Sequence, residues 1–222
     1  MRKPVALLAA LGLTATLTTV ALPAQADALC TITNYSPRTV VVGLSPVATT
    51  FKVSTTGCSR EGWDLDGEDF YVYDANPQEV FSPYSNSETK PKDVVVEAYN
   101  RAYETRAKVF ADAFRLKRRT TCDKFNASPE PVRKGSAITV QGRLRISDWS
   151  NDRYIGYTSR TVAVEFRTKT GKYSVVKYAK TGSGGYLKTT VKASKDGYWR
   201  LRYGGNTVAS SALVAGDFVD VK

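Results

Sequence analysis

The chain has 222 residues, with 32 Lys and Arg against 21 Asp and Glu and with no histidine. The missing imidazole excludes Ser-His-Asp and Cys-His catalysis, and it excludes histidine-bound zinc or iron. Acidic residues occur, but no spacing singles out the carboxylate pair that a glycosidase needs. We therefore predict a protein that is not an enzyme and needs no cofactor.

The N-terminus has the three-part pattern of a secretory leader. A basic start at Arg2 and Lys3 precedes an uncharged stretch, 5–22, and the small-x-small cleavage pattern Ala24-Gln25-Ala26 follows. We predict that residues 1–26 are a signal peptide and that the mature protein is secreted, extracellular or associated with the cell wall. After cleavage no integral membrane segment is expected. An uncleaved anchor is the alternative, which the weakly apolar, Thr-rich stretch disfavours.

Charge is distributed unevenly along the chain. Residues 27–128 hold 13 Lys or Arg and 14 Asp or Glu, whereas residues 129–222 hold 17 and 7. The change falls within the Pro-rich stretch 126–135, NASPEPVRKG. The 196 residues from Asp27 onward suit two domains of about 100 residues each. We place an N-terminal module at 27–128 and a basic C-terminal module at 129–222, joined by a short, stiff connector.

The first half reads as short strands separated by turn residues. Its runs are rich in β-branched and aromatic residues, and its prolines fall in the gaps. The stretch 93–117 also has apolar residues at helical spacing, but three consecutive valines and a later alternating run favour two strands joined at 100–107. The predicted strands cover residues 38–44, 49–55, 69–74, 93–99 and 108–117.

Three cysteines, Cys30, Cys58 and Cys122, lie in the first half. Export favours one disulfide, which leaves one thiol over. We favour Cys30–Cys58, with Cys122 as a buried free thiol, and Cys58–Cys122 is the competing pair. Wide spacings and the missing histidine argue against a cysteine metal site.

An acidic turn at DLDGED offers Asp64, Asp66 and Asp69 as oxygen ligands around a glycine. Oxygen ligands in a tight turn are what Ca²⁺ needs, although the order here is not that of an EF-hand loop. A calcium-dependent extracellular module is therefore one alternative for the function. A solvated acidic turn is the simpler interpretation.

The second half alternates more clearly. In 137–147 the apolar Ile138, Val140, Leu144 and Ile146 share one face, and the intervening polar residues share the other. The predicted strands cover 137–147, 161–169, 172–180, 186–193, 198–203 and 217–221. Such a count in about 100 residues is typical of an antiparallel sandwich. The fold class predicted for the whole mature chain is all-β, with two Ig-like antiparallel β-sandwiches in tandem.

Several stretches carry a resemblance to a known group of proteins. Residues 131–142, the region of Trp149, the run 162–166 and Asp196-Gly197-Tyr198-Trp199-Arg200 resemble an immunoglobulin-like β-sandwich module at the C-terminus of secreted actinobacterial proteins. Residues 36–54 look like the opening of a second such module. The resemblance implies architecture and export. Such proteins mostly have no assigned activity, so no catalytic or binding residue follows from it.

Eight basic residues of the second half are expected to point outward: Arg143, Arg145, Arg167, Lys169, Lys188, Lys192, Arg200 and Arg202. In an Ig-like sandwich the strands that carry them fall in two sheets, which predicts two basic faces. A basic surface with interleaved tyrosines suits an anionic cell-wall polymer or an acidic polysaccharide. Export argues against specific nucleic-acid recognition. Charge that serves only solubility is the alternative interpretation.

The segment 148–158, DWSNDRYIGYT, offers a different use for the second half. Trp149, Tyr154 and Tyr157 could anchor a protein partner, because aromatic residues dominate the energetics of such contacts. This predicts a secreted inhibitor or an adhesin as the rival function. The sequence leaves the oligomeric state open.

Overall fold

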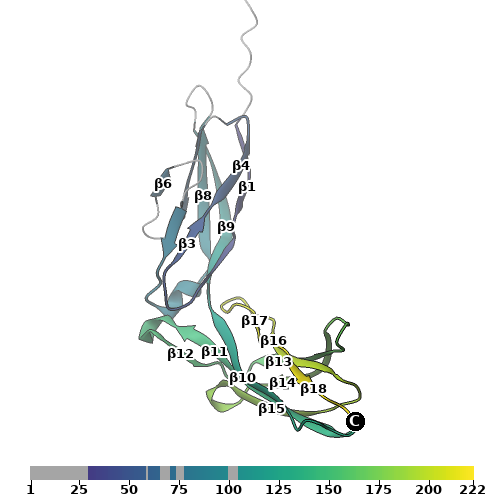
Figure 1. Cartoon of the computed structure of the whole chain (residues 1–222). Helices are drawn as coiled ribbons and strands as arrows, with labels where there is room; N and C mark the ends of the chain where they lie inside the picture. The colour runs from purple at the N-terminus through teal and green to yellow at the C-terminus, as the bar shows by residue number, and fades with distance from the viewer. Residues whose placement is uncertain (1–29, 59, 66–70, 74–77, 100–104) are drawn as a thin grey trace, which may run out of the picture.

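The computed structural model describes residues 30–58, 60–65, 71–73, 78–99 and 105–222. They form an all-β molecule in which two β-sandwiches follow one another along the chain (Figure 1). This confirms the predicted fold class. The signal peptide predicted at 1–26 lies outside the described residues and stays a prediction. Within the described part of the chain, no helix is long and apolar enough to cross a membrane.

The N-terminal sandwich combines one large sheet with two strand pairs. The large sheet has the order β2-β9-β8-β5-β6, and the pairs are β1-β4 and β3-β7. The stretch 93–117 forms the antiparallel strands β8 and β9, as predicted. The elements are β1 (Thr31–Ser36), β2 (Thr39–Val42), β3 (Val47–Thr50), β4 (Lys52–Thr56), β5 (Arg60–Leu65), β6 (Tyr71–Tyr73), β7 (Gln78–Phe81), η1 (Asn86–Thr89), β8 (Lys92–Tyr99) and β9 (Thr105–Arg118).

A disulfide closes one end of the β1-β4 pair. Cys30 immediately precedes β1, and Cys58 follows β4 and is bonded to Cys30. The two strands run antiparallel, with Thr31 opposite Thr56. The predicted Cys30–Cys58 bond is thus confirmed, and the competing Cys58–Cys122 pair is excluded. Cys122 is a free thiol, and it is partly rather than fully buried.

The C-terminal sandwich has two sheets. One contains β10-β11-β12, with β15 also paired to β11; the other has the order β14-β13-β16-β17, with β18 also paired to β16. The pairings β11-β15 and β13-β16 are those expected of an Ig-like sandwich. The elements are β10 (Thr120–Ser128), β11 (Ala137–Asp148), η2 (Trp149–Asn151), β12 (Arg153–Gly156), β13 (Thr161–Arg167), β14 (Ser174–Lys180), η3 (Ser183–Gly185), β15 (Tyr186–Lys192), β16 (Gly197–Tyr203), β17 (Ala212–Leu213) and β18 (Asp217–Val219).

Alternation along the strands fills the core of this sandwich. Ile138, Val140 and Leu144 of β11 are buried, whereas the alternate residues Thr139, Gln141 and Arg143 are more exposed. They pack in one cluster with Val164 of β13 and Leu201 of β16 from the facing sheet. The residues that the sequence pattern assigned to the interior are therefore the residues that hold the two sheets together.

Strand β10 belongs to the second sandwich, whereas the sequence interpretation put residues 120–128 at the end of the first. Its residues pair with β11 from Thr120 opposite Ile146 to Ser128 opposite Thr139. The register shifts between Asp123 and Asn126. This bulge interrupts the two-residue period, which is why TTCDKFNAS does not read as a strand of the following module.

The Pro-rich stretch 126–135 is fixed within the second sandwich and is not a free connector between modules. The backbone N–H of Val132 donates to the carbonyl of Asp220 (2.9 Å), and that of Lys134 donates to the carbonyl of Lys222 (2.8 Å). Gly135 N–H donates to the carbonyl of Ala193. Only Arg119 separates β9 from β10, so the chain passes between the sandwiches at that residue.

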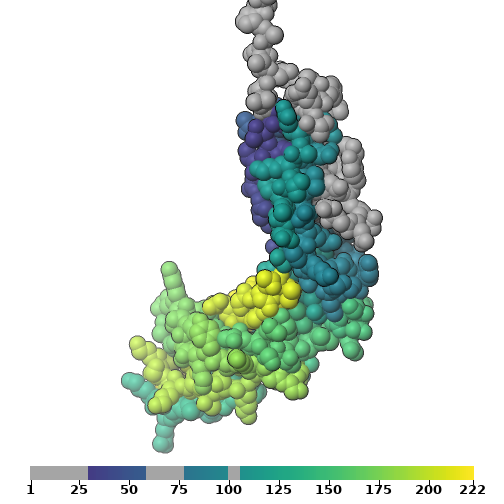
Figure 2. Space-filling model, turned by 180° about the vertical axis from the view of Figure 1, so that it is seen from behind, coloured from purple at the N-terminus to yellow at the C-terminus, as the bar shows by residue number. Residues whose placement is uncertain are grey.

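The junction of the sandwiches is hydrogen-bonded on both sides. Arg119 N–H donates to the carbonyl of Val42 in the first sandwich, and its carbonyl accepts from Ser147 N–H in the second. Arg118 Nε also donates to the carbonyl of Ser147 (2.5 Å). The space-filling view shows the two parts meeting at an angle around this junction (Figure 2). Because these hydrogen bonds hold the crossing at Arg119 to both sandwiches, the connection between them is not a flexible linker.

Candidate ligand-binding face

The eight predicted basic residues fall on two faces of the C-terminal sandwich. Arg143 and Arg145 lie on β11, and Lys188 and Lys192 lie on β15 beside it. Arg200 and Arg202 lie on β16 in the other sheet, and Arg167 ends the adjacent β13, with Lys169 following it. The structure thus brings the eight residues together as two groups of four, as the strand pattern predicted. The two groups differ in how their charges are compensated.

On the β13-β16 face a buried carboxylate pairs with two arginines. Glu165 of β13 receives hydrogen bonds from Arg200 Nε (2.8 Å) and Arg202 Nε (2.5 Å), and its side chain is only 5% exposed. Burial opposes ionisation of this carboxyl group, but the hydrogen bonds and charges of the two arginines outweigh it and lower the pKa of Glu165. The group is therefore an anion at neutral pH, and it pairs with both arginines of β16.

The remaining cations of that face lie over aromatic rings. The guanidinium of Arg167 is 4.3 Å from the ring centre of Tyr198, and that of Arg200 is 3.6 Å from the ring centre of Tyr173. Lys169 Nζ lies 5.1 Å from the centre of the Phe218 ring. Rings attract cations through the negative potential of their faces. These side chains form a packed layer of alternating cations and rings, which holds the cations in place without cancelling their charge.

On the β11-β15 face most of the charge is uncompensated. Arg145 forms a salt bridge with Asp123 (2.5 Å). In contrast, Arg143, Lys188 and Lys192 have no ion-pair partner within the described part of the chain, and neither does Lys124 of β10. Both lysines of β15 and Lys124 are exposed. Three predicted residues of this face and Lys124 therefore lack an ion-pair partner in the described chain, compared with Arg167 and Lys169 among the predicted residues of the opposite face.

A β-bulge shapes the centre of this face. Asp123 pairs with Arg143 and Asn126 pairs with Gln141, so Lys124 and Phe125 together oppose the single residue Gly142. Lys124 adopts φ +52°, a left-handed conformation that is uncommon for a residue with a side chain. The bulge opens the space between β10 and β11, and it places the Lys124 side chain on the outer surface.

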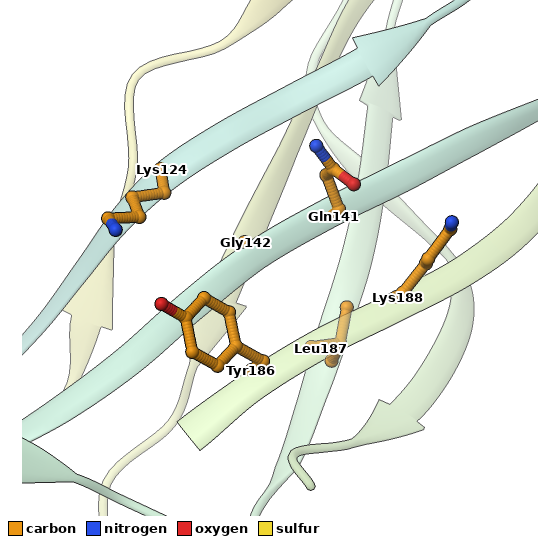
Figure 3. A pocket seen from close by; sticks show the side chains of 6 residues that line it. All are labelled: Lys124, Gln141, Gly142, Tyr186, Leu187 and Lys188. Carbon is orange, nitrogen blue, oxygen red and sulfur yellow. The ribbon is translucent and has the colours of Figure 1, made fainter. Parts of the chain in front are cut away.

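Below the bulge lies a shallow depression with a volume of about 270 Å³, lined by Lys124, Gln141, Gly142, Tyr186, Leu187 and Lys188. Figure 3 shows that these residues come from the three neighbouring strands β10, β11 and β15, and that the Tyr186 ring extends across β11 toward Lys124. Gly142 is opposite Leu187, so these two residues form the floor between the more exposed side chains.

Arg143 fixes the position of the Tyr186 ring. Its Nε donates to the carbonyl of Gly184 (2.9 Å), and its guanidinium carbon lies 4.9 Å from the ring centre. Arg143 and Tyr186 are also directly opposite each other in the β11-β15 ladder. The ring is nevertheless 49% exposed. The depression is therefore bordered by an aromatic surface that is held in place before any ligand arrives.

The structure changes the interpretation of the aromatic segment 148–158. Trp149, expected to anchor an external partner, is only 6% exposed and belongs to the core cluster of the N-terminal sandwich. Tyr157 packs edge-on against Tyr203 and accepts a hydrogen bond from Asn206 Nδ2 (3.0 Å). Tyr154 is half-buried, under Arg145. The prediction that Trp149 is an exposed anchor is wrong, because the fold turns this segment toward the first sandwich.

The calcium prediction remains open. Asp66 and Asp69 lie outside the described residues, and the structure describes the backbone of Asp64 in β5 but not its side chain. Within the described part of the chain, no group of three or more Cys, Asp and Glu side chains could hold a metal ion.

Sequence reasoning missed four residues of the depression, namely Lys124, Gln141, Gly142 and Leu187. One signal was present: a glycine inside a strongly alternating strand often marks a bulge or a close backbone approach. Gly142 is such a glycine. Its position between Gln141 and Arg143 would have pointed to a local irregularity on the basic face.

Comparison with known proteins gives structural similarities only. No family model matches the chain, and no curated protein matches it. Among solved structures, the D00-D0 domain of intimin is 15% identical over 86% of this chain and 99% of its own, with a TM-score of 0.31. A segment of a bacterial ice-binding adhesin is 13% identical over 87% of this chain and 65% of its own, with a TM-score of 0.30. At this level of similarity they identify no ligand.

Proposed function

We propose that this protein is an exported, non-enzymatic module that binds anionic cell-envelope polymers through the outer face of the β10-β11-β15 sheet. One observation carries the proposal: Lys124, Arg143, Lys188 and Lys192 share this face without an ion-pair partner in the described chain, whereas Arg200 and Arg202 of the opposite face share Glu165. Free charges on one surface attract a polyanion. The proposal narrows the predicted set of eight residues to one sheet.

The surface has the form that an extended polymer needs. Lys188 and Lys192 are four residues apart on β15, so their side chains point the same way along one strand. Arg143 and Lys124 lie across the sheet on β11 and β10. A polymer with repeated negative charges could contact several of these cations at once, and many weak contacts add up.

Charge reversal on this face tests the proposal. Binding of the mature protein to polygalacturonate is measured at low salt and at about 200 mM salt, with neutral dextran as the polymer control. We expect K188E/K192E to weaken binding by about tenfold or more at low salt. The matched control K52E/K90E reverses two exposed lysines of the N-terminal sandwich and makes the same change in net charge.

Two results would contradict the proposal. If both double variants weaken binding equally, net charge and not this face attracts the polymer. If the wild-type protein binds dextran as well as polygalacturonate, or if salt leaves binding unchanged, an anionic ligand is not recognised at all.

One observation favours a second function, that of a protein-binding module. Strand β14 is an edge strand with unusually exposed apolar side chains: Val176 is 48% exposed and Tyr178 is 63% exposed. Exposed edges can pair with an extended segment of another protein. A binding screen of secreted proteins against the wild type and V176K would test this function. A partner of this edge should bind the wild type even at high salt and should not bind V176K.

A further inference from the structure

We propose that the depression beside the Lys124 bulge binds one sugar ring of an acidic polysaccharide. Tyr186 would pack against the ring, Gln141 would hydrogen-bond its hydroxyl groups, and Lys124 and Lys188 would hold its acidic group. This inference rests on the proposed function and specifies its ligand. The protein would recognise the polymer by shape at the depression and by charge along the rest of the face.

Two unusual backbone features border the depression. Lys124 takes a left-handed conformation that is unfavourable for a residue with a side chain. Opposite it, Gly142 has no side chain, and an added Cβ would point toward the core and lie 2.6 Å from Leu201 Cδ1. An uninterrupted strand pair would lack both features and would present a flat surface. Bulges of this kind often redirect a side chain at a binding site.

The side chains that line the depression combine three kinds of chemistry. Tyr186 offers an apolar ring surface, Gln141 offers an amide that can donate and accept hydrogen bonds, and two lysines offer positive charge. A ligand that satisfies all three has C–H groups on one side, hydroxyl groups at its edge and an acidic substituent. An acidic sugar has these properties within a single ring.

The size of the depression and the number of its aromatic residues narrow the ligand further. A volume of about 270 Å³ lies just below the range of about 300–1,000 Å³ for small-molecule sites, which suits one unit of a polymer more than a whole ligand. The lining contains one aromatic residue. Single-stranded nucleic acid is held on successive aromatic rings that stack successive bases. One ring among amines and an amide therefore favours a sugar over a base.

Preorganisation of the ring strengthens the argument. Arg143 is anchored to the carbonyl of Gly184 and lies over Tyr186, and Gly184 itself allows a close approach: an added Cβ there would lie 3.3 Å from the ring. A side chain fixed in its binding orientation loses little conformational entropy on contact with a ligand. The exposed part of Tyr186 is thus suited to bind and is not a mobile surface residue.

The test compares three polyanions on the mature protein: polygalacturonate, inorganic polyphosphate and single-stranded DNA. We expect Y186A to weaken polygalacturonate binding by about tenfold, in line with loss of one aromatic packing contact, and to change polyphosphate binding less than about twofold. Y186F should bind polygalacturonate like wild type, because the ring and not the hydroxyl group makes the contact. Y84A, which removes an exposed tyrosine from the N-terminal sandwich, is the matched control. A thermal melt of each variant confirms folding.

The outcomes separate the two proposals. Equal losses for polygalacturonate and polyphosphate in Y186A, or no loss in either, would overturn the sugar site while leaving binding through charge intact. A larger loss for DNA than for polygalacturonate would replace the sugar with a base. If K188E/K192E binds both polygalacturonate and polyphosphate like wild type, the proposed function fails, whatever Y186A does.

Discussion

The indole Nε1 of Trp149 donates a hydrogen bond to the carbonyl oxygen of Gly43 over 2.9 Å, from the second sandwich to the first. The contact joins residues 106 positions apart. Next to it, Asn86 accepts from the backbone N–H of Trp149 and donates to Asp148 Oδ1 (2.6 Å). A side chain that follows β11 thus completes the core of the other module. The two sandwiches depend on each other for part of their stability.

Replacing Trp149 should therefore destabilise the protein. We expect W149A to lower the free energy of unfolding by about 3–5 kcal/mol, as for other buried large-to-small changes. W149F keeps an aromatic ring but leaves the Gly43 carbonyl without its donor, which costs about 1–3 kcal/mol. Urea unfolding measures both. Y178A removes an exposed ring and serves as a control, expected within about 0.5 kcal/mol of wild type. Wild-type stability in W149A would show that the junction contributes nothing.

The ion-paired Glu165 should make stability depend on pH in the acid range. Its folded-state pKa is lowered by Arg202 and Arg200 against the opposing effect of burial. The stability that it contributes is therefore fully present above the ordinary glutamate value of 4.5 and is lost as the pH falls through the lower folded value. The hydrogen bonds from Asn86 and Asn151 lower the pKa of Asp148 as well, so its contribution has the same sign.

The variant E165Q isolates the contribution of Glu165. At neutral pH it leaves two arginines without their anion; because Arg202 is 43% exposed, we expect a loss of about 2 kcal/mol, less than for a fully buried pair. Below pH 4.5 the difference from wild type should shrink. Unfolding curves between pH 3 and 7 test this, and a difference that stays constant with pH would refute the assignment.

Gly142 is expected to be required by the packing beneath the depression. The Cβ of G142A would lie 2.6 Å from Leu201 Cδ1, and Leu201 is buried. We expect a loss of about 1–3 kcal/mol from overpacking. Since the clash is with one side chain, the double variant G142A/L201A should be more stable than the sum of the two single losses predicts. G204A, where an added Cβ meets nothing within 4 Å, is the control. Strict additivity would contradict the proposed clash.

Local alternation explains why much of this molecule could be predicted from its sequence. A period of two along β11 placed Ile138 and Val140 inside and Arg143 and Arg145 outside, because successive side chains of a strand point to opposite faces. The same rule separated β8 from β9. The short-range pattern was sufficient where the strand was regular and where its neighbours simply covered the apolar side.

What the pattern could not provide depends on contacts between distant residues. The left-handed Lys124 breaks the period of β10, which hid both the strand and the depression. Only the β13-β16 register puts Arg200 opposite Glu165, so that two arginines predicted to bind a ligand become ion-pair partners of a buried carboxylate. In the sequence Trp149 resembles an exposed aromatic residue, but in the fold the first sandwich buries it. In each case the missing information was the identity of the neighbour and not the type of residue.

The free thiol of Cys122 should be poorly reactive in the folded protein. Cys122 packs against the core of the second sandwich, and burial, with the nearby charge of Asp123, raises its pKa to about 11 from an ordinary value of 9.0. Since the thiolate is the nucleophile, its fraction at pH 8 falls by about 100-fold, and limited access slows the reaction further.

Labelling of the non-reduced protein with iodoacetamide, followed by mass spectrometry, tests this prediction. Cys122 should be modified slowly in buffer and rapidly in guanidinium chloride. Cys30 and Cys58 should stay unmodified in both because they form a disulfide. Rapid native labelling would mean that β10 opens readily, and the bulge at Lys124 would then be a weak point of the sheet instead of a fixed part of the binding face.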